Sequence, residues 1–295
     1  MSAARNAILA RQGWDVAERG LIGAPPLPVI AGAEAHTTIF SALRLLGLAP
    51  PTLAPADEQG ALRELALDRP AIVCTQAGNV NSGAFDSFAV IAEACREAGA
   101  WLHVDGAFGL WAAASSRRAL LDGFEQADSW AADAHKWLNV PYDSGLAIVR
   151  DRAAHRAAMS LTAAYLVESG HRQNFDYVPE ASRRARAFAV YAALRSLGRH
   201  GLRDLVDRCC AHAERFAAIL TEGGAEILNE VVLNQVVVAC PPEVVPRIWE
   251  DGTCWLSGTH WRGRDALRIS VSGYGTTTED VERSAAAILT ALSSA

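Results

Sequence analysis

The stretch SWAADAHKWLNV, residues 129–140, places an apolar run of strand length directly before an acid, a histidine, a lysine and a tryptophan. Lysine is scarce in this sequence, and a strand-end lysine is ordinarily a solvated rim residue. Here Lys136 follows small apolar residues and lies between His135 and Trp137, which we interpret as a packing residue. A buried strand that ends in this way is typical of an α/β fold, in which ligands bind beyond the carboxyl ends of the strands.

Apolar runs of strand length alternate with helical patterns on either side of this stretch. Helical spacing predicts helices over 36–48 and 87–99, the second with Asp86 as its N-cap and Gly99 at its end. Because the apolar runs are continuous, we expect strands buried on both faces of a mostly parallel sheet. We predict an α/β large domain over residues 1–178, with strands at 27–32, 71–76, 100–104, 129–133 and 145–150.

The pattern changes after residue 178. Two long helical patterns, over 182–198 and 202–224, each end at glycine, and a closing helix is predicted over 278–292. Between them, the runs at 234–240, 252–258 and 266–272 alternate as strands of an antiparallel sheet do. We predict a small C-terminal α+β domain, with its linking helix, over residues 179–295.

Composition and charge exclude several classes of protein. The net charge of −6 argues against a nucleic-acid-binding protein, which normally carries a basic patch. The sequence has neither an apolar run of the ~18 residues of a transmembrane helix nor a secretory signal, so no membrane partner is expected. The six cysteines lack zinc-site spacing and are expected to be reduced and mostly buried, Cys209 and Cys210 included. These features predict a cytoplasmic protein without a metal site.

Polar residues follow three of the predicted strands, where the carboxyl ends of parallel strands meet. Taken alone, Asp105 is equally well explained as a turn or N-cap residue. A lysine in a partly desolvated site can form a Schiff base, and a buried carboxylate can hold a heteroaromatic nitrogen protonated. This pairing is typical of pyridoxal phosphate sites, with Asp105 as the acid and Lys136 as the Schiff-base lysine. His36 opens a helix after the first strand and is placed to stack on the ring.

HVDGAFG (103–109) together with DSWAADAHKWLNVPYDSG (128–145) resembles the group II pyridoxal-phosphate-dependent decarboxylases. That family includes the aromatic-amino-acid, histidine and glutamate decarboxylases. The resemblance runs almost end to end and implies a fold type I, pyridoxal-phosphate-dependent transferase-like structure. Further matching segments lie at 32–48, 76–86, 182–198 and 251–277.

The resemblance implies a role for each residue that matches the family's motifs. Lys136 corresponds to the lysine that forms the internal aldimine, and Asp105 to the carboxylate paired with the pyridine nitrogen. Ala107 corresponds to the small residue under the ring. His36 corresponds to the histidine that stacks over the ring and takes part in proton transfer, so the expected catalytic residues are Lys136, His36 and Asp105.

Two further cofactor-binding residues and a protonating residue are implied. His135 corresponds to the histidine near the cofactor phosphate, and Asn79 falls where the family often has a threonine near the ring hydroxyl. Many of these decarboxylases place a protonating tyrosine on a long loop after the lysine strand. The corresponding segment here, 163–184, is short, and Tyr177 is the candidate. A group of arginines follows, interpreted either as a solvated helix face or as a binding site for a substrate carboxylate: Arg183, Arg184 and Arg186.

The chain departs from the family at its N-terminus. Family members are considerably longer, and the part without a counterpart includes a Ser/Thr-Gly-Gly loop that binds the cofactor phosphate at a helix N-terminus. SAARNAIL, residues 2–9, corresponds to the helix soon after that loop. We therefore expect a truncated member, a fragment, or one half of a split protein.

The predicted function is the pyridoxal-phosphate-dependent decarboxylation of an L-amino acid through a Schiff base on Lys136. Two alternatives stay open. One is another pyridoxal phosphate reaction on the same fold, by an aminotransferase or a different lyase. The other is a truncated, inactive chain that does not hold the cofactor. The resemblance also implies a homodimer with active sites at the subunit interface, and no motif specifies which small-molecule amino acid is the substrate.

Overall fold

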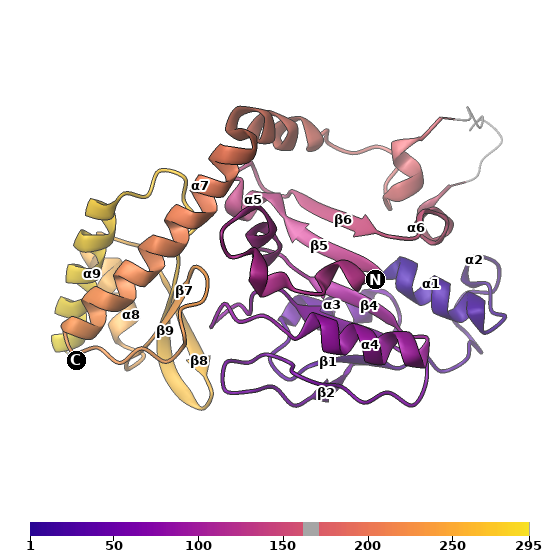
Figure 1. Ribbon diagram of the computed structural model, residues 1–295, viewed down its shortest axis with the longest axis horizontal. Helices are drawn as coiled ribbons and strands as arrows, with labels where there is room; N and C mark the ends of the chain where they lie inside the picture. The colour runs from indigo at the N-terminus through magenta and orange to yellow at the C-terminus, as the bar shows by residue number, and fades with distance from the viewer. Residues whose placement is uncertain (162–170, 295) are drawn as a thin grey trace.

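The larger of two sheets contains six strands in the order β2-β1-β3-β4-β5-β6 (Figure 1). The structure is a computed structural model, and it describes residues 1–161 and 171–294. All strand pairs are parallel except β5 and β6, so the predicted mostly parallel sheet is confirmed. The strands are β1 (Val29–Gly32), β2 (Thr52–Ala54), β3 (Ile72–Gln76), β4 (Trp101–Asp105), β5 (Ser129–Asp133) and β6 (Gly145–Val149).

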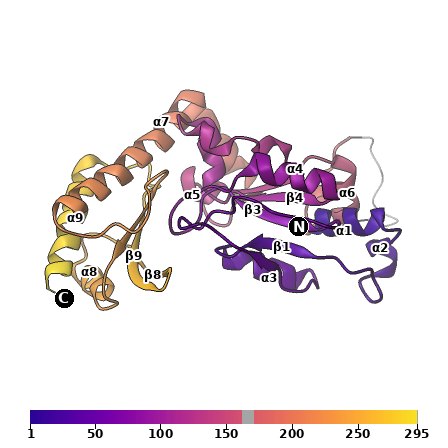
Figure 2. The same ribbon diagram turned by 60° about the horizontal axis from the view of Figure 1, so that its bottom comes forward.

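Helices cover both faces of this sheet, because successive side chains along each strand point to opposite faces. On one face, α4 (Phe88–Ala98) packs against Val73, Leu102 and Val104. On the other face, α1 (Ser2–Arg11) and α3 (Thr37–Leu45) share a core with Ile72 and Trp101. Figure 2 shows α4 and α3 on opposite sides of the strands. The continuous apolar runs are therefore explained by burial on both faces.

The start of α4 differs from the prediction. Its N-cap is Ser87, which makes no side-chain cap bond. The buried Asp86 carboxylate instead accepts hydrogen bonds from the backbone N–H groups of Leu62 (2.8 Å) and Gln76 (2.7 Å). Asp86 therefore ties the end of β3 to a distant loop. Gly99 ends the helix in the left-handed conformation, φ 64°, as predicted.

The second sheet is antiparallel and small, with the order β7-β9-β8. It consists of β7 (Gln235–Ala239), β8 (Ser257–Trp261) and β9 (Arg264–Ser270), and it is covered by α8 (Val244–Asp251) and α9 (Thr278–Ser293). The two helices predicted over 182–198 and 202–224 are joined as α7 (Ala187–Glu222). Gly198, with φ 60° and ψ −172°, interrupts α7 where the first predicted helix was expected to end. A capping box between Thr277 and Asp280 begins α9.

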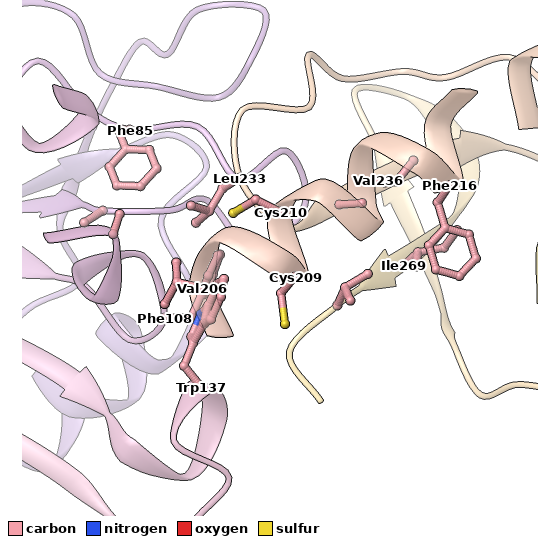
Figure 3. Close-up of a cluster of buried hydrophobic side chains, with 14 of the residues drawn as sticks. Phe85, Phe108, Trp137, Val206, Cys209, Cys210, Phe216, Leu233, Val236 and Ile269 are labelled. Atoms are coloured by element: carbon pink, nitrogen blue, oxygen red, sulfur yellow. The ribbon is translucent and has the colours of Figure 1, made fainter. Parts of the chain in front are cut away.

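A single apolar core joins the two sheets through the second part of α7 (Figure 3). Phe108, which follows β4, and Trp137 of α5 belong to the same cluster as Val206 and Cys210 of α7 and Val236 of β7. Trp137 is 0% exposed, which confirms its interpretation as a packing residue, although its indole N–H has no partner among the described residues.

The cysteines are unpaired, and all are buried except the half-buried Cys254, as predicted. Burial raises the pKa of the Cys209 thiol to about 11 and that of Cys210 to about 12.

Within the described residues, no helix is long and apolar enough to cross a membrane. Short elements complete the fold: α2 (Val16–Arg19), η1 (Gly109–Ala114), η2 (Arg118–Leu121), η3 (Phe124–Gln126), α5 (Ala134–Trp137), α6 (Arg152–Met159) and η4 (Asn174–Tyr177).

Candidate active site

The carboxyl ends of β3, β4 and β5 meet at one edge of the large sheet. Gln76 of β3 pairs with Asp105 of β4, and Asp105 pairs in turn with Ala131 of β5. β5 ends on Asp133 and continues directly into α5, the single helical turn that carries Lys136. The polar residues predicted at successive strand ends therefore lie at neighbouring strand ends in space.

Asp105 lies largely buried at the end of β4. Burial raises the pKa of its carboxyl above the ordinary value, whereas the Ala107 N–H and the charges of His36 and Lys136 lower it. The nearby Asp133 charge raises it again. One carboxylate oxygen accepts the Ala107 N–H at 3.2 Å. Such a carboxyl is stabilised in its ionised form by any cation that binds beside it.

Lys136 lies close to an acid and an aromatic ring. Its Nζ is 3.2 Å from Oδ2 of Asp133 and 5.6 Å from the centroid of the Phe108 ring, and its side chain is 37% exposed. A lysine in this position is held by the protein but open to a small molecule. The Asp133–Lys136 contact is a feature that the sequence analysis did not predict, although the three-residue spacing on one helical turn was visible in DAHK.

His135 is fixed on both of its ring nitrogens. Its Nδ1 lies 2.9 Å from the Ser144 carbonyl oxygen, and its Nε2 lies 3.5 Å from Asp133 Oδ2. The ring of Tyr142 packs beside it at a centroid distance of 4.3 Å. This imidazole is therefore oriented next to Lys136, although its predicted contact with a cofactor phosphate stays a prediction.

His36 is the N-cap residue of α3. Its Nδ1 accepts the backbone N–H of Thr38 at 3.3 Å and lies 2.8 Å from the Thr38 hydroxyl. Since Nδ1 accepts, the neutral ring carries its proton on Nε2. The start of the helix therefore fixes both the position of the ring and its tautomer.

Ala107 lies in a loop whose shape depends on two glycines. A Cβ on Gly106 would lie 2.6 Å from the Leu110 Cβ, and one on Gly109 would lie 2.1 Å from the Ala77 carbonyl oxygen. The Ala107 carbonyl accepts the Asp133 N–H at 2.8 Å. DGAFG thus brings the backbone after β4 close to the ends of both neighbouring strands.

Asn79 is buried and is used to hold its own loop together. Its amide nitrogen donates to the Glu34 carbonyl at 3.2 Å, and its amide oxygen accepts the N–H groups of Asn81 (2.8 Å) and Ser82 (3.2 Å). Its implied role beside a ring hydroxyl stays a prediction.

Tyr177 contacts α6. Its hydroxyl oxygen accepts a hydrogen bond from Arg152 at 2.7 Å, and His155 packs edge-on against its ring at 5.3 Å. In the part of the chain that the structure describes, no hydrogen bond joins Tyr177 to Asp105 or Lys136. Residues 162–170 of the predicted short loop lie outside the described residues, and the protonating role of Tyr177 stays a prediction.

The arginines before α7 pair with acids. Arg186 makes a bidentate contact with Asp143 at 3.0 and 2.8 Å, and Arg184 lies 3.4 Å from the same carboxylate. The Arg186 hydrogen bonds hold the pKa of Asp143 at about 2. Arg183 lies 3.6 Å from Glu180.

Arg268 on β9 is a cation that the sequence analysis missed. It donates to the Val80 carbonyl at 3.0 Å, just beyond the end of β3, while its buried Nε has no partner among the described residues. Burial lowers the pKa of its guanidinium. Sequence alone gives no signal for this position, because an arginine on an alternating strand is normally a solvated residue.

The pyridoxal-dependent decarboxylase conserved domain matches residues 32–240, which is more than half of the chain. The chain belongs to this family. It is 29% identical over 234 residues to an aromatic-L-amino-acid decarboxylase of Bacillus atrophaeus, a match that covers 72% of this chain and 49% of that protein. It is 31% identical over 217 residues to the acidic amino acid decarboxylase GADL1 of Mus musculus, covering 67% of this chain and 40% of that protein. This family member therefore spans about half of the length of these relatives, or less.

Solved structures give the same fold. Oryza sativa TDC with PLP and tryptamine superposes with a TM-score of 0.88 at 24% identity, covering 99% of this chain and 67% of that one. Mouse CSAD in its apo form gives a TM-score of 0.87 at 23% identity, covering 99% and 69%. The predicted fold type I architecture and family resemblance are both confirmed.

The chemistry of the strand ends fits the family's cofactor, pyridoxal phosphate. A largely buried carboxyl whose ionised form needs a cation suits a pyridinium nitrogen, and a partly exposed lysine amine suits an aldehyde. Asp105, Ala107, His36 and Lys136 are the residues that would hold the ring.

Proposed function

We propose that this chain carries the reactive centre of a pyridoxal-phosphate-dependent amino-acid decarboxylase, with Lys136 as the residue that binds the cofactor covalently. The observation that carries the proposal is that the Lys136 amine and the Asp105 carboxyl lie within electrostatic range at neighbouring strand ends. When bound, the cofactor supplies an aldehyde for an amine and a ring that accepts the electron pair released by a departing carboxylate.

The chain's own residues have distinct tasks in this proposal. Asp105 holds a proton at the ring nitrogen through an ion pair, which the buried setting of its carboxyl strengthens. His36 would stack on the ring, and its neutral form carries the proton on Nε2. Lys136 would supply the amine that holds the cofactor in place.

Arg268 is the residue that we assign to the substrate carboxylate. A guanidinium with an unused Nε suits bidentate recognition of a carboxylate. The pairing of Arg184 and Arg186 with Asp143 leaves these two residues less suited to that task.

We also propose the homodimer implied by the family. Apolar side chains are exposed at the beginning of α7, where Phe188 is 76% and Tyr191 63% exposed. An apolar cavity of about 530 Å³ is lined in part by Leu146 and Ile148 of β6 and by Leu194, further along α7. A second copy that covers this face would bury it. Analytical ultracentrifugation tests the proposed homodimer, since a monomer at micromolar concentration contradicts it.

The cytoplasmic location stays a prediction that rests on the buried, unpaired cysteines.

Cofactor titration followed by borohydride reduction tests the proposed function. Lys136 is the only lysine of the sequence, so a reduced lysine–cofactor bond found by peptide mapping has a single possible side-chain position. We expect saturable micromolar binding and one labelled peptide. The matched control is Lys136→Arg, which keeps the charge but cannot form the bond.

The outcomes separate the alternatives. Carbon dioxide and an amine as products support the decarboxylase, whereas a keto acid indicates an aminotransferase on the same fold. If the cofactor does not bind the 295-residue chain, the proposal is wrong for this chain, and the alternative of an inactive chain holds.

A further inference from the structure

The Asp133 carboxylate points toward Lys136 and does not cap the helical turn that follows it. It is the N-cap residue of α5, yet its side chain accepts no hydrogen bond from the backbone of that turn. An aspartate at an N-cap normally accepts one or two such bonds. Here Oδ2 lies 3.2 Å from Lys136 Nζ and 3.5 Å from His135 Nε2. The capping explanation for this residue therefore does not apply.

The backbone of Asp133 is held in place by the sheet and the loop beside it. Its backbone N–H donates to the Ala107 carbonyl at 2.8 Å, and its own carbonyl accepts the Trp111 indole N–H at 3.0 Å. Across the strand pair lies Gly145, where a Cβ would be only 3.6 Å from Oδ1. None of these backbone contacts involves Lys136, so the sheet positions the backbone from which the carboxylate reaches the flexible lysine side chain.

We propose that Asp133 is a positioning residue for Lys136, which it holds as an ammonium at the end of β5 until the amine reacts with an aldehyde. The other groups that face Lys136 are the His135 imidazole, the Phe108 ring and the more distant Asp105 carboxylate. An ammonium has no free electron pair, so it loses a proton to solvent before its nitrogen attacks. The ion pair thus places the nitrogen and at the same time lowers its reactivity.

The rate of acetylation of Lys136 by N-hydroxysuccinimide acetate tests this without any cofactor. The reaction forms an amide and releases N-hydroxysuccinimide and a proton. Because the sequence has a single lysine, mass spectrometry of one peptide reports the rate, with a lysine-containing reference peptide in the same tube. At pH 7 and low salt we expect Asp133→Asn to be acetylated about two- to fivefold faster than the unmodified protein, as for a partly exposed ion pair. Equal rates overturn the proposal.

A high-salt measurement separates electrostatic positioning from a structural effect. The rate difference should shrink in 1 M salt, which screens partly exposed charges. A difference that persists unchanged in 1 M salt means that the substitution altered access to Lys136, and it overturns the proposal.

Two variants complete the test. Asp143→Asn removes an acid that pairs with Arg186, and it should leave the acetylation rate unchanged. In a His135→Asn background, Asp133→Asn should still raise the rate. If the effect disappears there, the carboxylate acts through the imidazole and the proposal fails. The inference concerns the same lysine as the proposed function, but its readout needs no cofactor, so the failure of either is seen separately.

Discussion

Acid should destabilise this protein through His103. The side chain lies on β4, is 6% exposed, and has its Nδ1 2.8 Å from the Ser129 hydroxyl, which also accepts the Trp101 indole N–H. Burial, helped by the charge of the N-terminal amino group, lowers the pKa of His103 to about 3. The unfolded chain binds the proton near pH 6.5, so the stabilisation is complete above that pH and is lost as pH falls toward 3.

The magnitude follows from the two pKa values. At pH 5 the unfolded state gains about 2 kcal/mol relative to the folded state, and the loss reaches about 4 kcal/mol at pH 3. A typical domain is stable by only ~5–15 kcal/mol, so this one residue matters. His103→Gln removes the titrating group and keeps a hydrogen-bonding side chain.

Urea unfolding at pH 7 and pH 5, followed by circular dichroism, provides the measurement. Between these two pH values, the unmodified protein should lose about 2 kcal/mol more than His103→Gln, while the carboxylate contributions common to both cancel. The control is His260→Gln, which removes an exposed histidine and should keep the slope of the unmodified protein. An equal loss in His103→Gln and the unmodified protein would refute the reasoning.

Three further predictions concern the loops and the site. Gly109→Ala should lower the free energy of unfolding, measured in urea, by about 3 kcal/mol, because the new Cβ would lie 2.1 Å from the Ala77 carbonyl oxygen. The control is Gly275→Ala, which has open space around the new Cβ and should change the free energy of unfolding little. Equal effects of the two substitutions contradict the argument. Thr277→Ala removes the capping box of α9 and should cost about 1 kcal/mol in the same assay; an unchanged midpoint means that the cap is not formed in solution. Asp105→Asn should weaken pyridoxal phosphate binding at least about tenfold in a fluorescence titration, since it removes the ion pair with the ring nitrogen; unchanged affinity excludes that pairing.

The strands of the larger sheet other than β2 could be predicted because each contains a largely apolar run, whereas β8 lies at Ser257–Trp261 and not over the predicted 252–258. β2 could not be predicted, since Thr52–Ala54 has only three residues, one of them buried, within a proline-containing stretch. Asp86 was predicted to be a cap because its local pattern fits one. Its real partners, Leu62 and Gln76, are brought to it by the tertiary fold.

The candidate site was predictable to a similar degree. Asp105, His36 and Lys136 follow strands. Parallel pairing brings the carboxyl ends of neighbouring strands to the same edge of a sheet, so these residues could be expected to lie close together. The link between Asp133 and Lys136 needed side-chain geometry, because an aspartate before a helical turn is ordinarily its cap. Arg268 needed the approach of β9 to the loop after β3, which no local pattern contains.

The shared core described above has a consequence for the order of events during synthesis. Trp137, directly after Lys136, lies in the same apolar cluster as Val206 and Val236, which the ribosome adds about 70 to 100 residues later. A nascent chain that has just completed the larger sheet therefore contains Lys136, Asp105 and Asp133. It lacks the apolar side chains of α7 and β7 that belong to the same core as Trp137. Competence to react should thus appear late in translation, after the second part of α7 has joined the core that contains the indole.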